Sequence, residues 1–120
     1  SVRVYVATAP VRLNRSFDGL SAEVRSVLGR DPLSGHVFVF LNRRRTMVKL
    51  LVYTRGGYTI VHKRLEKGCF AFTAGVHAEA TSIEIDVHEL SMLLEGVHLA
   101  DVRKTKASRR WDPPRHARVA

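Results

Sequence analysis

The chain has 120 residues, of which 45% are hydrophobic, and its formal net charge is +9. This length has room for one domain and this composition is sufficient for a hydrophobic core, so we expect one compact unit. No segment approaches the roughly 18 apolar residues of a membrane helix and the first residues lack the layout of a signal peptide, so we expect a soluble, cytoplasmic protein without a membrane partner.

The charge is divided into blocks along the chain. Residues 36–67 hold eight Lys or Arg and one Glu, residues 68–102 hold six acids and no Lys or Arg, and residues 103–120 hold seven Lys or Arg and one Asp. Clustered positive charge of this size favours a polyanion such as DNA as a partner. The alternative, which the sequence leaves open, is that these residues only keep a small protein in solution.

The first 29 residues predict a strand and a helix. Residues 2–7 alternate between Val and other residues, which is typical of a half-buried strand. Ser16 can cap a helix that ends at Gly29. The apolar stripe of this helix recurs at helical spacing and consists of Phe17, Leu20, Val24, Val27 and Leu28.

A turn and a buried strand follow. Residues 30–35 contain Asp, Pro, Ser and Gly, which are the usual turn-forming residues. The next five residues, Val37–Leu41, are all apolar and do not alternate with polar ones. This pattern predicts a strand that is covered on both faces and lies at the centre of the sheet.

The segment 46–66 predicts a β-hairpin. Two β-rich runs, Met47–Thr54 and residues 58–65, flank Gly56-Gly57, which can form a two-residue turn. This turn would place Lys49 opposite Arg64, Leu51 opposite His62, Tyr53 opposite Ile60 and Arg55 opposite Tyr58. These eight residues would share one mixed side of the hairpin, while the other, mostly apolar side faces the core.

The last predicted elements are two short strands, a helix and a tail. Residues 69–73 and Ser82–Ile85 are the strands. Asp86 and Glu89 have the spacing of a capping box, and Gly96 ends the helix, whose stripe consists of Val87, Leu90, Leu93, Leu94 and Val97. The fold class is therefore α+β: a single domain over residues 1–102, with a largely antiparallel sheet of about five or six strands and two helices, followed by a basic tail at residues 103–120 that we expect to be flexible.

The mixed side of the hairpin is a candidate nucleic-acid surface. Lys49 facing Arg64 would repel each other without an anion between them, and cations interleaved with aromatic rings suit phosphates and bases. The alternative is that a helix packs on this side, against Leu51 and Ile60, while the cations extend to water. The candidate residues of this region are Arg43, Arg44, Arg45, Lys49, Tyr53, Arg55, Tyr58, His62 and Arg64.

The tail is a second candidate for contact with DNA. A mobile basic arm can follow a phosphate backbone without reading its sequence, although it can also be a solvated terminus without a role. The predicted second helix is acidic, so a recognition helix is not indicated. The cations of the tail, which precede Trp111, are Arg103, Lys104, Lys106, Arg109 and Arg110.

The sequence predicts neither catalytic residues nor a metal or cofactor site. Asp18, Asp31, Glu66 and Asp86 each have a structural role in the predicted elements, whereas metal-dependent DNA cleavage needs two or three converging carboxylates. The six histidines do not have zinc-site spacing. Cys69, the single cysteine, is expected to be a small buried hydrophobe.

Four segments carry a family resemblance. They are residues 14–20 (NRSFDGL), 31–40 (DPLSGHVFVF), 63–68 (KRLEKG) and 93–97 (LLEGV). In order and spacing they resemble the TnpB accessory proteins, encoded by the second open reading frame of the sixty-sixth insertion-sequence family, over about residues 2 to 112. This family is distinct from the RNA-guided nucleases that share the name.

The resemblance implies a bacterial mobile-element protein encoded beside a separate transposase, which carries the cutting and joining chemistry. It supplies no catalytic or ligand residues. We therefore expect a non-enzymatic accessory protein of transposition that binds DNA non-specifically and assists the transposase. The alternative is an adaptor that docks on the transposase through the acidic residues 68–102 and does not contact DNA.

Overall fold

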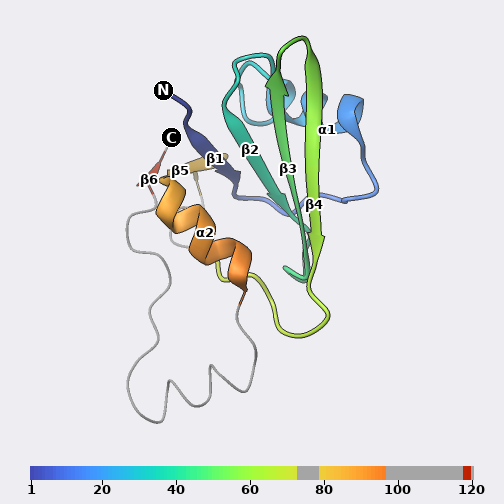
Figure 1. Ribbon diagram of the computed structural model, residues 1–120, viewed down its shortest axis with the longest axis vertical. Helices are drawn as coiled ribbons and strands as arrows, with labels where there is room; N and C mark the ends of the chain where they lie inside the picture. Colours follow the sequence, from blue (N-terminus) through green and yellow to red (C-terminus); the bar gives the residue numbers. More distant parts are fainter. Residues whose placement is uncertain (73–78, 97–117, 120) are drawn as a thin grey trace.

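Six strands form one sheet in the order β4-β3-β2-β1-β5-β6, and two helices pack on it (Figure 1). The computed structural model describes residues 1–72, 79–96 and 118–119. Neighbouring strands are antiparallel except β1 and β2, which are parallel. The predicted α+β class is confirmed. The elements are β1 (Val4–Ala7), α1 (Phe17–Ser26), β2 (Val37–Leu41), β3 (Met47–Thr54), β4 (Gly57–Arg64), β5 (Ser82–Ile85), α2 (Val87–Glu95) and β6 (Arg118–Val119).

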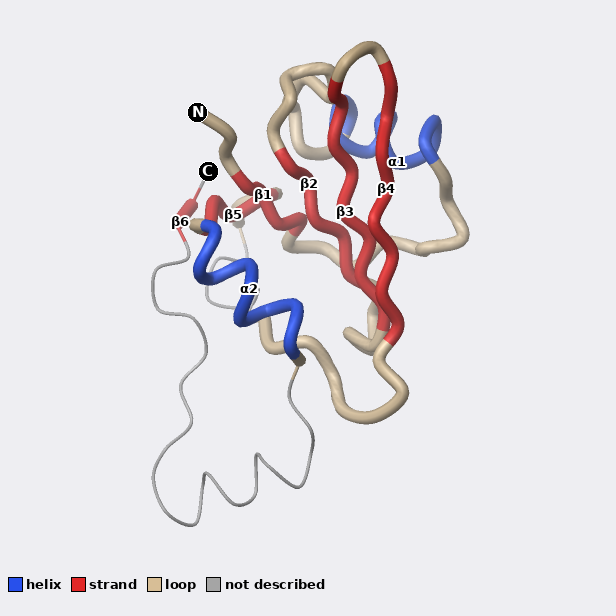
Figure 2. Tube along the Cα trace, viewed as in Figure 1, coloured by secondary structure: helices blue, strands red, loops and turns tan. Residues whose placement is uncertain are grey.

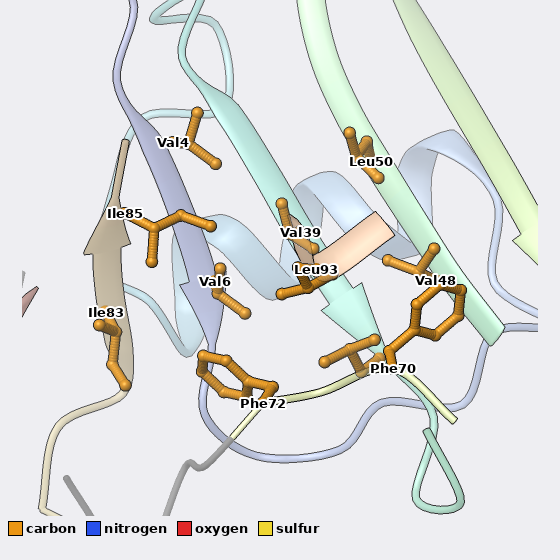
Figure 3. Close-up of a cluster of buried hydrophobic side chains, with 11 residues drawn as sticks. Val4, Val6, Val39, Val48, Leu50, Phe70, Phe72, Ile83, Ile85 and Leu93 are labelled. Carbon is orange, nitrogen blue, oxygen red and sulfur yellow. The ribbon is translucent and has the colours of Figure 1, made fainter. Parts of the chain in front are cut away.

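The helices cover opposite faces of the sheet, so the molecule has three layers (Figure 2). On the α2 face, Leu93 packs with strand side chains and with Phe70 and Phe72 (Figure 3). On the α1 face, Leu20 and Val24 pack with the alternate side chains of the same strands. Because both faces are covered, all four residues of β1 are buried, and the prediction of a half-buried first strand was wrong.

The central position of β2 is confirmed. Four of its five residues are buried, and it lies between β1 and β3 in the sheet. Its pairing with β1 is parallel because the connection between them contains α1, which returns the chain to the same end of the sheet. The hydrogen bond from Val37 N to Arg3 O, 2.9 Å long, begins this pairing.

The hairpin forms with a different turn from the predicted one. Thr54 pairs with Gly57, so the turn residues are Arg55 and Gly56, which have φ values of 48° and 83°. Two consecutive positive φ angles are typical of a type I′ turn. The register therefore differs by two residues from the prediction: Lys49 faces His62 and not Arg64. A shift of two residues preserves the alternation, so each side chain stays on its predicted side.

The two predicted helix starts differ in their capping. At α2, Asp86 accepts a hydrogen bond from Glu89 N at 2.7 Å, and Glu89 Oε1 accepts from Asp86 N at 3.0 Å, which confirms the capping box. Ser16 is the N-cap of α1, but its side chain makes no capping hydrogen bond. Gly96 is the C-cap of α2, with φ of 78°, as expected for a glycine that ends a helix. α1 ends earlier than predicted, because its C-cap is Val27, and Gly29, with φ of 65°, lies two residues beyond it.

The apolar stripes predicted for the two helices contain residues that the structure leaves exposed. Leu20, Val24, Leu28 and Leu93 are buried, and Leu90 and Leu94 are half-buried. Phe17, Val27 and Val87 lie at or beyond helix ends, where the chain leaves the sheet, and they are exposed. Val97 lies outside the described residues.

The segment after the hairpin also differs from the prediction. Residues 69–72 contain one isolated bridge at Cys69 and no strand, and Thr73 lies outside the described residues. Phe70 and Phe72 are buried in the α2-side core, so their apolar character reflects packing and not strand pairing. Cys69 is exposed and not the buried residue that was expected.

Of the expected tail, the structure describes only β6, which pairs antiparallel with β5. The rest of the predicted tail lies outside the described residues, so its flexibility stays a prediction. Within the described ranges, no helix has the length and apolar composition that crossing a membrane requires.

Candidate nucleic-acid interface

One end of the sheet gathers residues from four strands. Because β1 and β2 are parallel, both end there, and because β3 and β4 are antiparallel to β2 and to each other, β3 begins there and β4 ends there (Figure 1). The turn at residues 42–46, which joins β2 to β3, carries the Arg43-Arg44-Arg45 triplet. The sheet topology therefore places the triplet beside the segments that follow β1 and β4.

Asn42 holds this turn in a defined shape. Its Oδ1 accepts hydrogen bonds from the amides of Thr46 and Met47, both at 2.9 Å, and its Nδ2 donates to Thr46 Oγ1 at 3.0 Å. Arg45 N donates to Asn42 O at 3.0 Å, and Arg45 O accepts from Phe70 N at 2.7 Å. These bonds keep Arg45 in the left-handed region, with φ of 57°, while Arg43 and Arg44 are exposed to solvent.

The end of β4 adds further positive charge to this turn. Arg64 pairs in register with Met47, and Leu65 N donates to Thr46 O at 2.8 Å. Arg64 Nη2 lies 3.1 Å from Glu66 Oε1, but both side chains are more than two-thirds exposed. The attraction between the two charges is therefore weak. We call this cluster the basic end; it consists of Arg43, Arg44, Arg45, Arg64 and Lys67.

A hollow of about 220 Å³ opens beside the arginine turn. It lies between the segment that follows β1 and the turn that follows β2. None of its lining residues is acidic, and two of them are arginines. The lining consists of Ala7, Thr8, Ala9, Pro10, Leu41, Asn42, Arg43, Arg45 and Phe72.

The hairpin tip is separate from the basic end. Tyr53 and Tyr58 pair across β3 and β4 with ring centroids 5.1 Å apart, and Arg55 follows them in the turn. β3 has eight residues, so the tip lies about 23 Å from the arginine turn. The predicted residues of the hairpin therefore form two groups and not one continuous surface.

Helix α1 covers the middle of the mixed side. Leu51 is fully buried there, and Met47, Tyr58 and Ile60 pack against the same cluster as Leu20 of α1. Figure 1 shows α1 behind β3 and β4. At the centre of the mixed side, the alternative that a helix packs there is therefore correct. A ligand cannot reach Leu51.

The two cations that were expected to oppose each other are separated. Lys49 is half-buried, and its Nζ donates to Arg15 O at 2.7 Å. His62, which faces it, is exposed, and Arg64 belongs to the basic end. The argument from Lys49 facing Arg64 therefore does not hold.

The five basic residues of the tail that were predicted to contact DNA lie outside the described residues. Their contact with DNA stays a prediction, as does that of the hairpin residues. They are Arg103, Lys104, Lys106, Arg109 and Arg110.

Each of the four carboxylates that were considered for catalysis makes a local contact or lies at a helix start. Asp31 Oδ1 accepts from Leu33 N at 2.9 Å in the turn before β2, and Asp18 lies in the first turn of α1. Asp86 caps α2 and Glu66 pairs with Arg64. In the part of the chain that the structure describes, no three His, Cys, Asp or Glu residues gather as metal ligands.

Sequence reasoning missed two features of this region. Lys67 was not singled out, although it follows the hairpin in the same basic segment. The hollow between residues 7–10 and the turn that begins at Asn42 was also missed, because it depends on the parallel pairing of β1 with β2, which no local pattern reveals.

Comparisons with known proteins give a consistent assignment. The model of the family described as IS66 Orf2 like protein matches residues 2–104. Two proteins of Sinorhizobium fredii (strain NBRC 101917 / NGR234), the uncharacterized proteins y4hO and y4jC, are 32% and 31% identical to the chain. These matches cover 94% and 90% of the chain, and 91% and 90% of the relatives.

No solved structure matches the chain significantly. The family match spans most of the sequence and includes all four segments that carried the resemblance. The chain belongs to the IS66 Orf2-like family, a family of insertion-sequence accessory proteins.

Proposed function

We propose that this protein is an accessory factor of bacterial insertion-sequence transposition that binds DNA through its backbone phosphates and assists a separate transposase. Family membership supports the insertion-sequence setting. The observation that carries the DNA-binding part is the basic end, where the fold gathers four arginines and a lysine at one end of the sheet.

The proximity of these cations favours a polyanionic partner. Neighbouring strands are about 4.8 Å apart, and the Debye length at physiological salt is about 8 Å, so the potentials of the turn and of the end of β4 add. A phosphate backbone relieves their mutual repulsion and releases its counterions on binding.

The contacts are expected to be insensitive to base sequence. A recognition helix needs cationic or polar side chains that can enter a groove, whereas α2 presents two exposed acids, its N-cap Asp86 and its last residue Glu95. In α1 the basic residue Arg25 is balanced by Asp18 and Glu23. Binding by the arginine turn alone fixes position on the backbone and does not read bases.

The test is the salt dependence of binding to a fluorescent duplex. The logarithm of the affinity should fall linearly with the logarithm of salt concentration, by about 0.9 for each phosphate neutralised. Arg43→Ala and Arg44→Ala should each reduce the magnitude of this slope by about 1. A flat salt response, or no binding at about 50 mM salt, would overturn the proposal.

Arg55→Ala is the matched control. It removes the same charge from an exposed arginine at the hairpin tip, about 23 Å from the arginine turn. Because the proposal assigns DNA contact to the basic end and not to the hairpin tip, this variant should leave the slope unchanged. If it reduced the slope as much as Arg43→Ala does, the basic end would have no special part in binding, and the affinity would depend only on net charge.

A second candidate function is that of an adaptor to the transposase. It is favoured by the outer face of α2, on which Val87 is 68% exposed and Met92 45% exposed, close to the exposed Glu95. Exposed apolar side chains next to acids suit a partner with a basic surface. Co-purification with the transposase that persists after nuclease treatment would favour the adaptor, while its loss would favour a DNA bridge.

A further inference from the structure

The hollow beside the arginine turn has the properties of a site for one small anionic group. It forms where two parallel strands end, between residues 8–10 and the turn at residues 42–46. Phe72 lines it from the core side, and Figure 3 shows Phe72 near the end of β1. This position makes the hollow a product of the fold and not of one flexible loop.

The lining supplies hydrogen-bond donors without a competing carboxylate. Arg43 and Arg45 both line the hollow, and among the described residues no carboxylate forms an ion pair with either of them. The backbone amides of Ala9 and Arg43 have no hydrogen-bond partner among the described residues. Guanidinium groups together with backbone amides are the donors that protein sites use to hold phosphate oxygens.

The hollow has room for a phosphate group. Its volume of about 220 Å³ is far above the roughly 10–15 Å³ that one water molecule needs. It is below the roughly 300–1,000 Å³ of pockets that enclose drug-sized ligands. A tetrahedral anion with its ester oxygens fits within this volume.

The arginine turn is held in shape by hydrogen bonds within the protein. Arg45 has a left-handed backbone, which is unfavourable for residues other than Gly, Asn and Asp, and its amide and carbonyl are both fixed by hydrogen bonds. Strained residues gather at binding sites. Arg55 is also left-handed, at the hairpin tip, so strain alone does not define the site; the hollow and its donors do.

We propose that the hollow binds a single phosphodiester of the DNA backbone, with Arg43 and Arg45 as its charged donors. The inference rests on the proposed function for the source of the phosphate. The phosphate bound in the hollow would make short-range hydrogen bonds, in addition to the long-range electrostatic attraction of the basic end. Binding at this position would fix the rotation of the protein on the duplex, although it would carry no base specificity.

The experiment is an NMR titration of the full chain, labelled with ¹⁵N, with dimethyl phosphate as the diester and methyl phosphate as the monoester. Saturable shifts are expected for the amides of Ala9, Arg43 and Arg45 with the diester. Shifts that appear with the monoester alone would assign the hollow to a free or terminal phosphate and overturn the backbone assignment. Absence of saturable shifts with both esters would overturn the site itself.

Arg45→Asn and Arg55→Asn form a matched pair of variants. Asn tolerates the left-handed backbone, so both turns should be retained, as the dispersion of the spectra checks. Arg45→Asn should weaken binding of the diester about tenfold or more, because it removes a charged donor, and Arg55→Asn should not change it. Equal affinity in all three proteins would overturn the proposal. Arg43→Gln provides a second test if Arg45→Asn fails to fold.

The outcomes separate this inference from the proposed function. DNA binding with the expected salt slope but without saturable shifts around the hollow would remove the phosphate site and leave the accessory function standing. Saturable binding of the diester without binding to duplex DNA would support the site and overturn the DNA-binding function.

Discussion

Two capping residues that follow the same sequence rule behave differently. Asp86 accepts a hydrogen bond from Glu89 N, and Glu89 returns one to Asp86 N. Ser16 also precedes a helix, but its hydroxyl makes no bond to the first turn. The residue type indicates that a cap can form, and the side-chain conformation decides whether it does.

A pair of alanine variants measures this difference. Asp86→Ala should lower the free energy of unfolding by about 1 kcal/mol, because it leaves a helical amide without its partner. Ser16→Ala should cost only a small part of that. Urea denaturation monitored by circular dichroism gives both values, and equal losses would show that Ser16 also caps its helix in solution.

The left-handed arginine of the hairpin turn leads to a second prediction at this scale. Arg55 and Gly56 occupy the two positions of a type I′ turn, for which Asn-Gly is the preferred pair. Arg55→Asn should therefore raise the free energy of unfolding by about 0.5–1 kcal/mol. Thermal denaturation at matched salt concentration is the measurement, and a lower midpoint temperature would contradict the assigned turn.

At the scale of elements, α1 determines what the hairpin can contact. The mixed side has polar residues at both ends and apolar residues at its centre, and the centre is where α1 packs. Leu20 of the helix and Leu51 of β3 are both fully buried in this cluster. Of the side chains that remain exposed on this side, His62 and Arg64 lie towards the basic end and Arg55 lies at the hairpin tip.

The packing of α1 can be tested within the helix. Leu20→Ala should lower the free energy of unfolding by about 2–5 kcal/mol, because it leaves a cavity between helix and sheet. Arg25→Ala, at an exposed position of the same helix, should change it by no more than about 0.5 kcal/mol. Similar effects of the two substitutions would mean that α1 does not cover the hairpin.

At the scale of the whole molecule, the fold separates the charges that the sequence already groups. The described acids of residues 68–102 lie mainly on β5 and α2, while the basic end adjoins β3 and β4. The amino terminus lies at the opposite end of the sheet from the arginine turn (Figure 1). A duplex that binds at the basic end should therefore leave Ser1 accessible.

Amine labelling provides a test of this orientation. Saturating duplex DNA should protect Lys67 from acetylation several-fold, because it would lie against the phosphate backbone. The exposed amine at Ser1 should react at an unchanged rate. Mass spectrometry of the labelled peptides measures both rates. Protection of Ser1 without protection of Lys67 would place the DNA at the other end of the sheet.

The sequence by itself determined the features that depend on neighbours in the chain. Apolar and β-rich runs, together with turn and capping residues, located β2, β3, β5 and the start of α2, and the order of motifs identified the family. It placed the hairpin side chains on their correct sides, because the alternation survives a shift of two residues. The same local reasoning misplaced the turn, since Arg55 and not Gly57 takes the left-handed position.

Only the tertiary structure decided which faces are covered and which cations meet. Residues 69–72 have the composition of a strand, but Phe70 and Phe72 fill the core under α2. The hollow at the basic end requires β1 to pair in parallel with β2, about 30 residues further along the chain. Such contacts arise from burying apolar surface between distant segments, and a local pattern of residues does not specify them.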